Sequence, residues 1–145
     1  MTDNAKRWCV LIPCSKTETW AVPQNCLGEI VTLQTDAELP PKELNWRGLV
    51  VPVLDLGSAD GSPWRDAHRG TGLIAIFLGL KGEKCEYWGM AVRGDGLRAV
   101  SLSPEEVEDM PEHAGEHAAA AFNLHGLLCQ VPDLDGFQKN IAANL

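Results

Sequence analysis

Two histidines in an acidic segment have the spacing that metal chemistry requires. His113 and His117 stand four positions apart, so they would share one face of a helix. Glu112, Glu116 or Cys129 could then complete a zinc site, as in a small metal-dependent hydrolase. No other enzyme chemistry is indicated, because the chain lacks a nucleophile elbow, a phosphate-binding loop, a dinucleotide-binding glycine motif and an HExxH motif.

The segment around these histidines is a poor helix. Gly115 lies between them and Pro111 precedes them, and both residue types disfavour helical backbone. We therefore interpret the two histidines as solvated side chains of an acidic loop and retain the hydrolase only as a remote alternative. We expect a protein that is not an enzyme and carries no cofactor.

Tryptophan and arginine offer a different kind of chemistry, because both are enriched at protein–protein binding hot spots. The chain has five tryptophans in 145 residues. Three lie in strand patterns and are interpreted as core residues: Trp8, Trp20 and Trp88. Trp46 and Trp64 each precede an arginine outside such patterns. Each of these two indoles either packs onto the protein or contacts a partner.

The element that must position Trp46 is an apolar run from Leu49 to Leu54. A run without polar alternation predicts a strand buried on both faces. Pro52 cannot donate a hydrogen bond to a sheet, so it predicts an edge or a bulge. Together these features indicate a small closed barrel with one unpaired flank. We predict that a partner binds there through Trp46, Arg47, Val51 and Pro52, with the apolar contacts around Val51 and Pro52 contributing most of the affinity.

The remaining chain reads as many short strands separated by turns, which favours a sandwich or barrel. Strands are predicted over 8–14, 19–22, 29–33, 73–80 and 85–92, and a long polar loop over 57–72. Two short helices are predicted, one from the capping pattern at Ser103 to Met110 and one over 135–144. Residues 118–121 remain open between helix and strand.

Charge and length limit the class of partner. A chain of 145 residues fits one domain. The net charge of -8 disfavours nucleic acid, whose binding requires phosphate neutralisation, and also disfavours anionic membrane surfaces. The first residues carry no apolar stretch long enough for a signal peptide or a membrane span, so we expect no direct membrane insertion.

Five cysteines, an odd number without CxxC spacing, indicate reduced thiols in a cytoplasmic protein. Cys9 and Cys14 lie in one predicted strand at an odd separation, so they should face opposite sides of it.

Several of these segments resemble the CheW-like domains, which are adaptors of bacterial chemotaxis arrays. The signature of that family is Arg-Gly, two variable residues, Val-Pro-Val or Val-Pro-Ile, one variable residue and Asp-Leu. It is matched here by Arg47-Gly48, Val51-Pro52-Val53 and Asp55-Leu56. Segments 20–31, 89–92 and 100–107 are similar to further parts of the family pattern in the same order.

The resemblance implies an all-β fold of two small five-stranded β-barrel subdomains that share a core, with one or two short helices. It implies a single CheW-like domain over residues 6–145 after a short tail of residues 1–5. It also implies an ion pair between Glu29 and Arg47, because the family carries opposite charges at these places. The implied partners are the regulatory domain of a CheA-type histidine kinase and the cytoplasmic tip of a chemoreceptor.

Three departures from the pattern bear on partner choice. Gly57 begins a longer loop than the family has, Arg93 stands where an acidic residue is common, and the closing segment 122–135 is compressed. These differences leave open an alternative, a divergent accessory scaffold that serves a pilus-linked, surface-motility or other signalling pathway outside the array.

Overall fold

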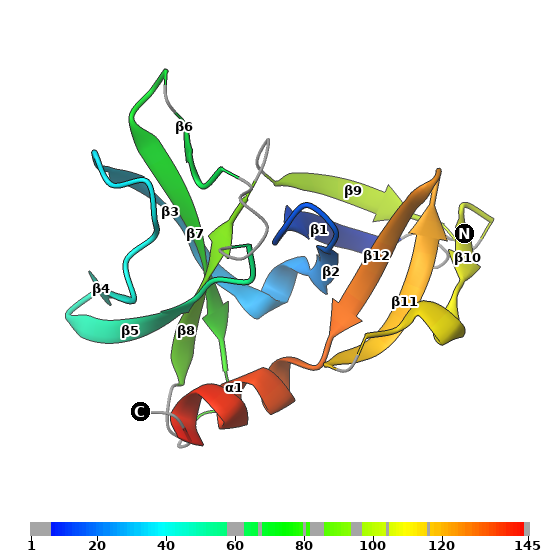
Figure 1. Cartoon of the computed structure of the whole chain (residues 1–145). Helices are drawn as coiled ribbons and strands as arrows, with labels where there is room; N and C mark the ends of the chain where they lie inside the picture. Colours follow the sequence, from blue (N-terminus) through cyan, green and yellow to red (C-terminus); the bar gives the residue numbers. More distant parts are fainter. Residues whose placement is uncertain are drawn as a thin grey trace.

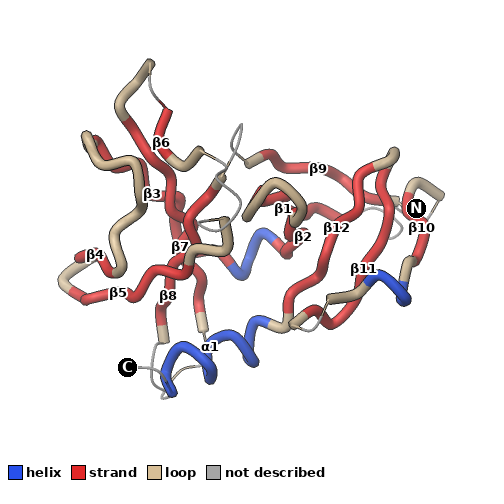
Figure 2. The backbone as a smooth tube through the Cα atoms, viewed as in Figure 1, coloured by secondary structure: helices blue, strands red, loops and turns tan. Residues whose placement is uncertain are grey.

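The chain was analysed as a computed structural model, which describes residues 7–57, 63–66, 68–79, 81, 86–93, 97–103, 105–115 and 117–143. The described chain forms two curled, half-barrel sheets of six strands each and one α-helix (Figure 1). Strands dominate the described residues, in which the remaining helical structure consists of short 3₁₀ turns at Gln24–Cys26 and Pro111–His113 (Figure 2).

Sheet 1 has the strand order β10-β11-β12-β2-β1-β9 in the described part of the chain. Its strands are β1 Arg7–Pro13, β2 Thr19–Pro23, β9 Arg98–Leu102, β10 Val107–Asp109, β11 Ala118–Leu124 and β12 Leu127–Pro132. All neighbours are antiparallel except β12 and β2, which run parallel. The sheet therefore joins the first and last strands of the chain.

Sheet 2 has the order β3-β7-β8-β5-β4, with the short β6 paired to β7. Its strands are β3 Leu27–Gln34, β4 Glu43–Trp46, β5 Leu49–Leu54, β6 Arg65–Asp66, β7 Thr71–Leu78 and β8 Tyr87–Val92. β5 lies antiparallel to β4 and parallel to β8. In the described residues β3 and β4 are the two edges of this sheet.

A shared core lies between the two sheets. Each curled sheet also encloses an interior of its own, and we call sheet 1 half-barrel 1 and sheet 2 half-barrel 2. Alternation along β1 divides its side chains, since Val10 and Ile12 enter the shared core while Cys9 and Leu11 enter the interior of half-barrel 1. Cys14 lies in the shared core, which confirms that Cys9 and Cys14 face opposite sides.

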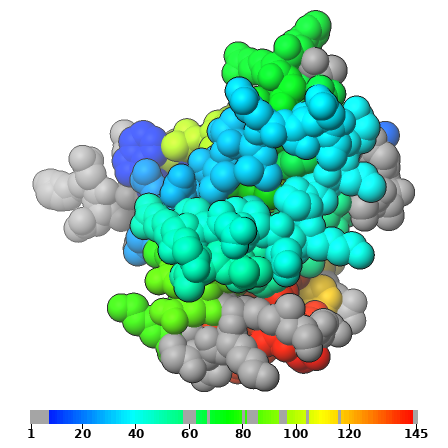
Figure 3. Space-filling model, turned by 90° about the vertical axis from the view of Figure 1, so that its left-hand side faces the viewer, coloured from blue at the N-terminus to red at the C-terminus, as the bar shows by residue number. Residues whose placement is uncertain are grey.

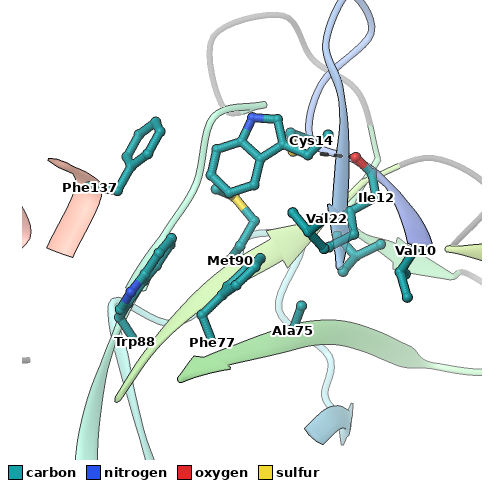
Figure 4. Close-up of a cluster of buried hydrophobic side chains, with 11 residues drawn as sticks. Val10, Ile12, Cys14, Val22, Ala75, Phe77, Trp88, Met90 and Phe137 are labelled. Atoms are coloured by element: carbon teal, nitrogen blue, oxygen red, sulfur yellow. Dashed lines mark hydrogen bonds between the residues drawn. The ribbon is translucent and has the colours of Figure 1, made fainter. Parts of the chain in front are cut away.

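Aromatic rings from both sheets and from the helix meet in the shared core (Figure 4). The ring of Phe77 stacks on Trp88 at 4.6 Å between centroids, and Trp20 lies 5.9 Å from Phe77. Phe137 of α1 (Leu134–Ala143) contacts Trp20 at 5.0 Å and Trp88 at 6.1 Å. The helix therefore covers one end of the space between the sheets and binds to both.

The all-β architecture with two barrel-like halves and a shared core is confirmed. Each half has six strands in the structure, compared with the five expected, because the two-residue β6 and three-residue β10 are counted. The predicted strands agree with β1, β2, β3, β7 and β8 to within two or three residues. The helix predicted over 135–144 is confirmed as α1, although residue 144 lies outside the described residues.

The helix predicted from Ser103 to Met110 is wrong. Ser103 and Glu106 do contact each other, since Ser103 Oγ donates to Glu106 Oε1 at 2.8 Å and the Glu106 N–H donates to the Ser103 carbonyl at 3.0 Å, but these are not the side-chain-to-backbone bonds of a capping box. They close only a turn, after which β10 pairs with β11. Residues 118–121, left open by the sequence, belong to β11. Pairing across the sheet overrides the local helix signal in both places.

Candidate partner-binding surface

The Arg47-Gly48 pair forms the tight turn of the β4–β5 hairpin. Arg47 has φ 50° and Gly48 φ 80°, and the flanking residues Trp46 and Leu49 pair directly. Positive φ at both central positions is the signature of a type I′ turn, whose twist matches that of the strands. Glycine adopts this conformation freely, whereas arginine requires support from neighbouring contacts.

That support comes from a cluster of Glu29, Trp46 and Arg47. The Trp46 indole N–H donates to Glu29 Oε1 at 2.9 Å, and Arg47 Nη2 lies 3.4 Å from the same oxygen. The guanidinium carbon of Arg47 sits 4.6 Å from the centroid of the Trp46 ring. Because Glu29 belongs to β3 and Trp46 to β4, the cluster connects the two edges of sheet 2.

The cluster is more exposed than expected for a bridge at a partly buried site. The side chains of Arg47 and Glu29 are 67% and 45% exposed. Solvent screens an ion pair of this kind, so its contribution to stability is small. Its role is to set the direction of Arg47, which projects beside the apolar strand that follows.

Three residues predicted or considered for partner contact are buried in half-barrel 2. Val51 is fully buried, Trp46 is 7% exposed and Trp64 is 5% exposed. The Trp64 N–H donates to the Leu73 carbonyl at 2.9 Å, and its ring lies against Gly72, where a Cβ would clash. These side chains fill the barrel interior, so direct contact of Val51, Trp46 or Trp64 with a partner would require the barrel to open.

The exposed apolar side chains lie one position away on the same strand. Leu49 is 46% exposed and Val50 is 64% exposed, so β5 is not buried on both faces at its start. The recorded pairing of β5 with β8 involves only Val53 and Leu54. In the described residues, the segment before Val53 is therefore paired with β4 alone, and Pro52, which is half-buried, lies just before the point where the ladder with β8 begins.

We call the exposed surface of Arg47, Leu49 and Val50 the hairpin patch. It lies on the face that β3, β4 and β5 form, coloured blue to teal in Figure 3. Leu78, which is 43% exposed, lies close to the Trp46 ring across Gly28 and extends the apolar surface at one side. An apolar patch beside a fixed cation is a surface typical of protein contacts.

A second surface is the groove between the two sheets. It is an open cavity of about 300 Å³ between β1, β3 and β9. Its apolar lining comes from Val10, Leu27, Ile30, Leu97 and Ala99. Glu29 also borders the groove, so one carboxylate lies between the groove and the hairpin patch.

Arg93 has a structural position that the sequence did not indicate. It is 2% exposed, and its Nε donates to Asp55 Oδ1 at 3.0 Å while Nη2 donates to Asp55 Oδ2. The Arg93 N–H donates to the Pro13 carbonyl at 2.7 Å, which joins the end of β8 to the end of β1. The reversed charge at position 93 therefore does not face a partner, because it neutralises the carboxylate that ends the apolar strand.

The two histidines considered for a metal site make other contacts. His113 ends a 3₁₀ turn and its Nδ1 lies 3.4 Å from Glu112, while the His117 ring contacts Phe137 at 5.4 Å. Among the described residues, no group of three His, Cys, Asp or Glu side chains is placed to hold a metal ion. Glu116 lies outside the described residues.

Sequence reasoning also missed a second hairpin of the same design. Asn123-Leu124-His125-Gly126-Leu127 repeats the pattern of residues 45–49, and its turn residues again have positive φ, 50° at His125 and 87° at Gly126. Here the His125 Nε2 lies 3.2 Å from Glu106 Oε2. The shared spacing of asparagine, a basic residue, glycine and leucine was the signal that could have revealed it.

Three of the four described thiols are buried, those of Cys9, Cys14 and Cys129. Cys9, Cys14, Cys26 and Cys129 are free. Burial raises the pKa of Cys14 well above its usual value, and burial, with the neighbouring Cys9, raises the pKa of Cys129 to about 11. Both thiols are therefore protonated and unreactive at neutral pH.

Comparison with known proteins supports the fold. No protein-family model and no curated protein sequence matches the chain. Among solved structures, the scaffolding protein TtCheW from Thermoanaerobacter tengcongensis superposes with a TM-score of 0.61 at 17% sequence identity. The match covers 89% of this chain and 90% of that one. The chain therefore has a CheW-like fold in a divergent sequence.

None of the helices in the described part of the chain has the length and apolar character needed to cross a membrane.

Proposed function

We propose that this protein is a cytoplasmic, non-enzymatic scaffold that holds the regulatory domain of a CheA-type histidine kinase against the cytoplasmic tip of a chemoreceptor. The observation that carries the proposal is the hairpin patch, an exposed apolar start of β5 beside Arg47, on a CheW-like fold. The likeness in fold to TtCheW, a scaffolding protein, supports a scaffolding role.

The hairpin patch is the proposed kinase-binding surface. Leu49 and Val50 would enter an apolar depression of the kinase domain, and Arg47, held by Glu29 and Trp46, would fix the orientation. A patch on a tight hairpin suits this role because little backbone entropy is lost on binding. The buried Trp46 and Val51 then support the patch from below.

The groove between the sheets is the proposed binding site for the receptor's helical tip. Its apolar lining of Leu27, Ile30 and Leu97 would receive the apolar face of a helix. Because Glu29 borders both surfaces, a helix in the groove would lie next to the cluster that orients Arg47. The scaffold would thus supply binding free energy and fixed geometry, so that receptor motion biases kinase output.

The kinase contact is tested by calorimetric titration of the kinase regulatory domain with Val50→Asp. A carboxylate at the centre of the apolar contact should weaken binding at least tenfold, because it would be desolvated without a partner. Ala119→Asp, an exposed alanine on β11 of the other sheet, is the matched control and should bind normally. Val51→Asp is unsuitable, since a charge in the barrel interior unfolds the protein. Normal binding by a folded Val50→Asp variant would remove the hairpin patch from the interface.

The receptor contact is tested with Ala99→Asp, which places a charge in the groove at an exposed position on β9. This variant should lose binding to the receptor tip and keep binding to the kinase domain, whereas Val50→Asp should do the reverse. Loss of both partners from one variant would mean that the two surfaces are not separate sites.

A further inference from the structure

The interiors of the two half-barrels are filled by side chains of very different size. Half-barrel 2 contains two tryptophans and two isoleucines, namely Trp46, Trp64, Ile74 and Ile76. Among the described residues, the buried side chains of half-barrel 1 are Leu11, Phe122 and Leu124 together with the small Cys9, Ala21 and Cys129, so this interior holds no tryptophan. Small barrels are either filled by their own side chains or leave room for a ligand.

Half-barrel 1 has that room. An open cavity of about 560 Å³ enters it, with Cys9 and Ala21 at the base and Leu102, Phe122 and Val131 on the walls. The volume lies within the range of small-molecule sites in proteins, about 300–1,000 Å³. All of the cavity's described lining residues are uncharged.

Trp8 stands at the mouth of this cavity. It is 63% exposed, although its place in β1 predicted a core residue. The indole N–H groups of Trp20, Trp46 and Trp64 each donate to a protein oxygen, at 2.7, 2.9 and 2.9 Å. Those of Trp8 and Trp88 have no such acceptor in the described part of the chain, and of these two only Trp8 is exposed. Water can accept the Trp8 N–H, and the indole face is available to a molecule that enters the cavity.

We propose that half-barrel 1 binds a small, neutral, planar apolar molecule. The described lining is uncharged and therefore favours a neutral molecule over an ion, because a buried ion would find no partner among these residues. The rings of Trp8 and Phe122 favour a flat ligand that stacks on them. The side-chain amides of Gln24 and Asn25 border the cavity and provide donors and acceptors for one polar group. The cavity adjoins the groove assigned to the receptor tip, because Gln24 borders both, and the two share no other described lining residue.

Titration with N-phenyl-1-naphthylamine, a neutral planar probe whose fluorescence rises in apolar surroundings, tests the proposal. The whole protein should bind the probe saturably at one molecule per chain. Ala21→Phe places a ring inside the cavity and should weaken binding at least tenfold. Ala99→Phe is the matched control, because Ala99 lines the groove between the sheets and not the cavity, and it should leave binding unchanged.

A second variant protects the test against misfolding of Ala21→Phe, since Ala21 is buried. Leu102→Trp fills the cavity from its half-buried wall on β9 and should also weaken probe binding at least tenfold, with thermal unfolding unchanged. Trp8→Ala should weaken it at least threefold, because one stacking surface is lost.

Three results would each overturn the proposal. One is the lack of saturable probe binding. Another is binding that Ala99→Phe abolishes and the cavity-filling variants spare, since the probe would then occupy the groove. The last is a concentration-dependent dimer that Trp8→Ala converts to monomer, because a second copy of the chain would then cover the mouth.

Discussion

Half-barrel 1 and half-barrel 2 differ in how side chains fill their interiors. In half-barrel 2, Trp46 and Trp64 occupy the interior, and Gly72 leaves space for the Trp64 ring. In half-barrel 1, Cys9 and Ala21 leave an open cavity of about 560 Å³. Curled sheets with the same number of strands can therefore have either a filled interior or one that a cavity enters, and the volume of the inward-facing side chains decides between the two.

The two half-barrels also differ at the surface, in the basic residue of their hairpin turns. Arg47-Gly48 and His125-Gly126 form the same turn, and each basic side chain lies near a glutamate from another segment, Glu29 or Glu106. Arg47 is always charged, while the charge of a histidine depends on pH. The filled half-barrel thus presents a permanent cation beside exposed valine and leucine, which is the surface that we assign to the kinase.

The largest expected difference between the half-barrels comes from removing a ring. Trp64→Ala should destabilise the fold by about 3–5 kcal/mol, because it leaves a large void in a filled interior. Phe122→Ala should cost roughly 2 kcal/mol, since the ring borders a cavity that is already open and little enclosed void is created. Chemical denaturation of both variants measures this, and equal losses would contradict the distinction between filled and hollow interiors.

Replacing a buried alanine by leucine in each interior should also change the free energy of unfolding by different amounts. Ala91→Leu enlarges a fully buried side chain in half-barrel 2 and should cost about 1–3 kcal/mol through overpacking. Ala21→Leu extends into the cavity of half-barrel 1 and should leave the free energy of unfolding within about 0.5 kcal/mol of the parent, or raise it. Thermal and denaturant midpoints give the comparison. A loss for Ala21→Leu that matches Ala91→Leu would show that the cavity closes in solution.

The buried thiols of half-barrel 1 should make its stability sensitive to alkali. The pKa of Cys129 is raised by burial from 9.0 to about 11 in the folded protein. The contribution of this thiol to the free energy of unfolding is therefore intact below pH 9. It is lost as pH rises from 9 to 11, because the thiol ionises at a lower pH in the unfolded chain than in the folded protein. The thermal midpoint should fall across that window, and the fall should be shallower in Cys129→Ala. Burial also raises the pKa of the half-exposed Cys26, but less than that of Cys129, so Cys26→Ala should flatten the fall less; a larger flattening by Cys26→Ala than by Cys129→Ala would refute the assignment.

The smallest effect is expected at the exposed ion pair of the first hairpin. A double-mutant cycle of Glu29→Ala and Arg47→Ala should give a coupling free energy below about 1 kcal/mol that decreases with salt, because both side chains are solvated. The equivalent cycle on Glu106 and His125 should give a coupling free energy that is no larger, because these side chains are also solvated. A coupling above about 2 kcal/mol at Glu29 and Arg47 would mean that this cluster closes half-barrel 2 rather than orienting one side chain.

Much of the fold could be predicted from local pattern and from the resemblance to CheW-like domains. The Arg-Gly pair indicated the entry to β5, Pro52 indicated an interrupted flank, and odd spacing placed Cys9 and Cys14 on opposite sides of β1. These features depend on backbone geometry and on the spacing of residues that are only a few positions apart in the sequence.

The candidate surface could not be read in the same way. Alternation tells which side chains share a face, but not which face another sheet covers, and so Trp8 was expected in the core while Trp46 was considered for the surface. The Arg93–Asp55 pair joins residues 38 positions apart, beyond the reach of any local pattern.

What the sequence by itself determined is therefore the succession of strands, the turns between them and the class of fold. Only the tertiary structure decided that Val50 rather than Val51 faces solvent, that half-barrel 2 is filled by Trp46 and Trp64, and that an open cavity enters half-barrel 1. The physical reason is that burial and cavity volume depend on which distant strands close over a side chain, a property of the whole packed chain rather than of any segment.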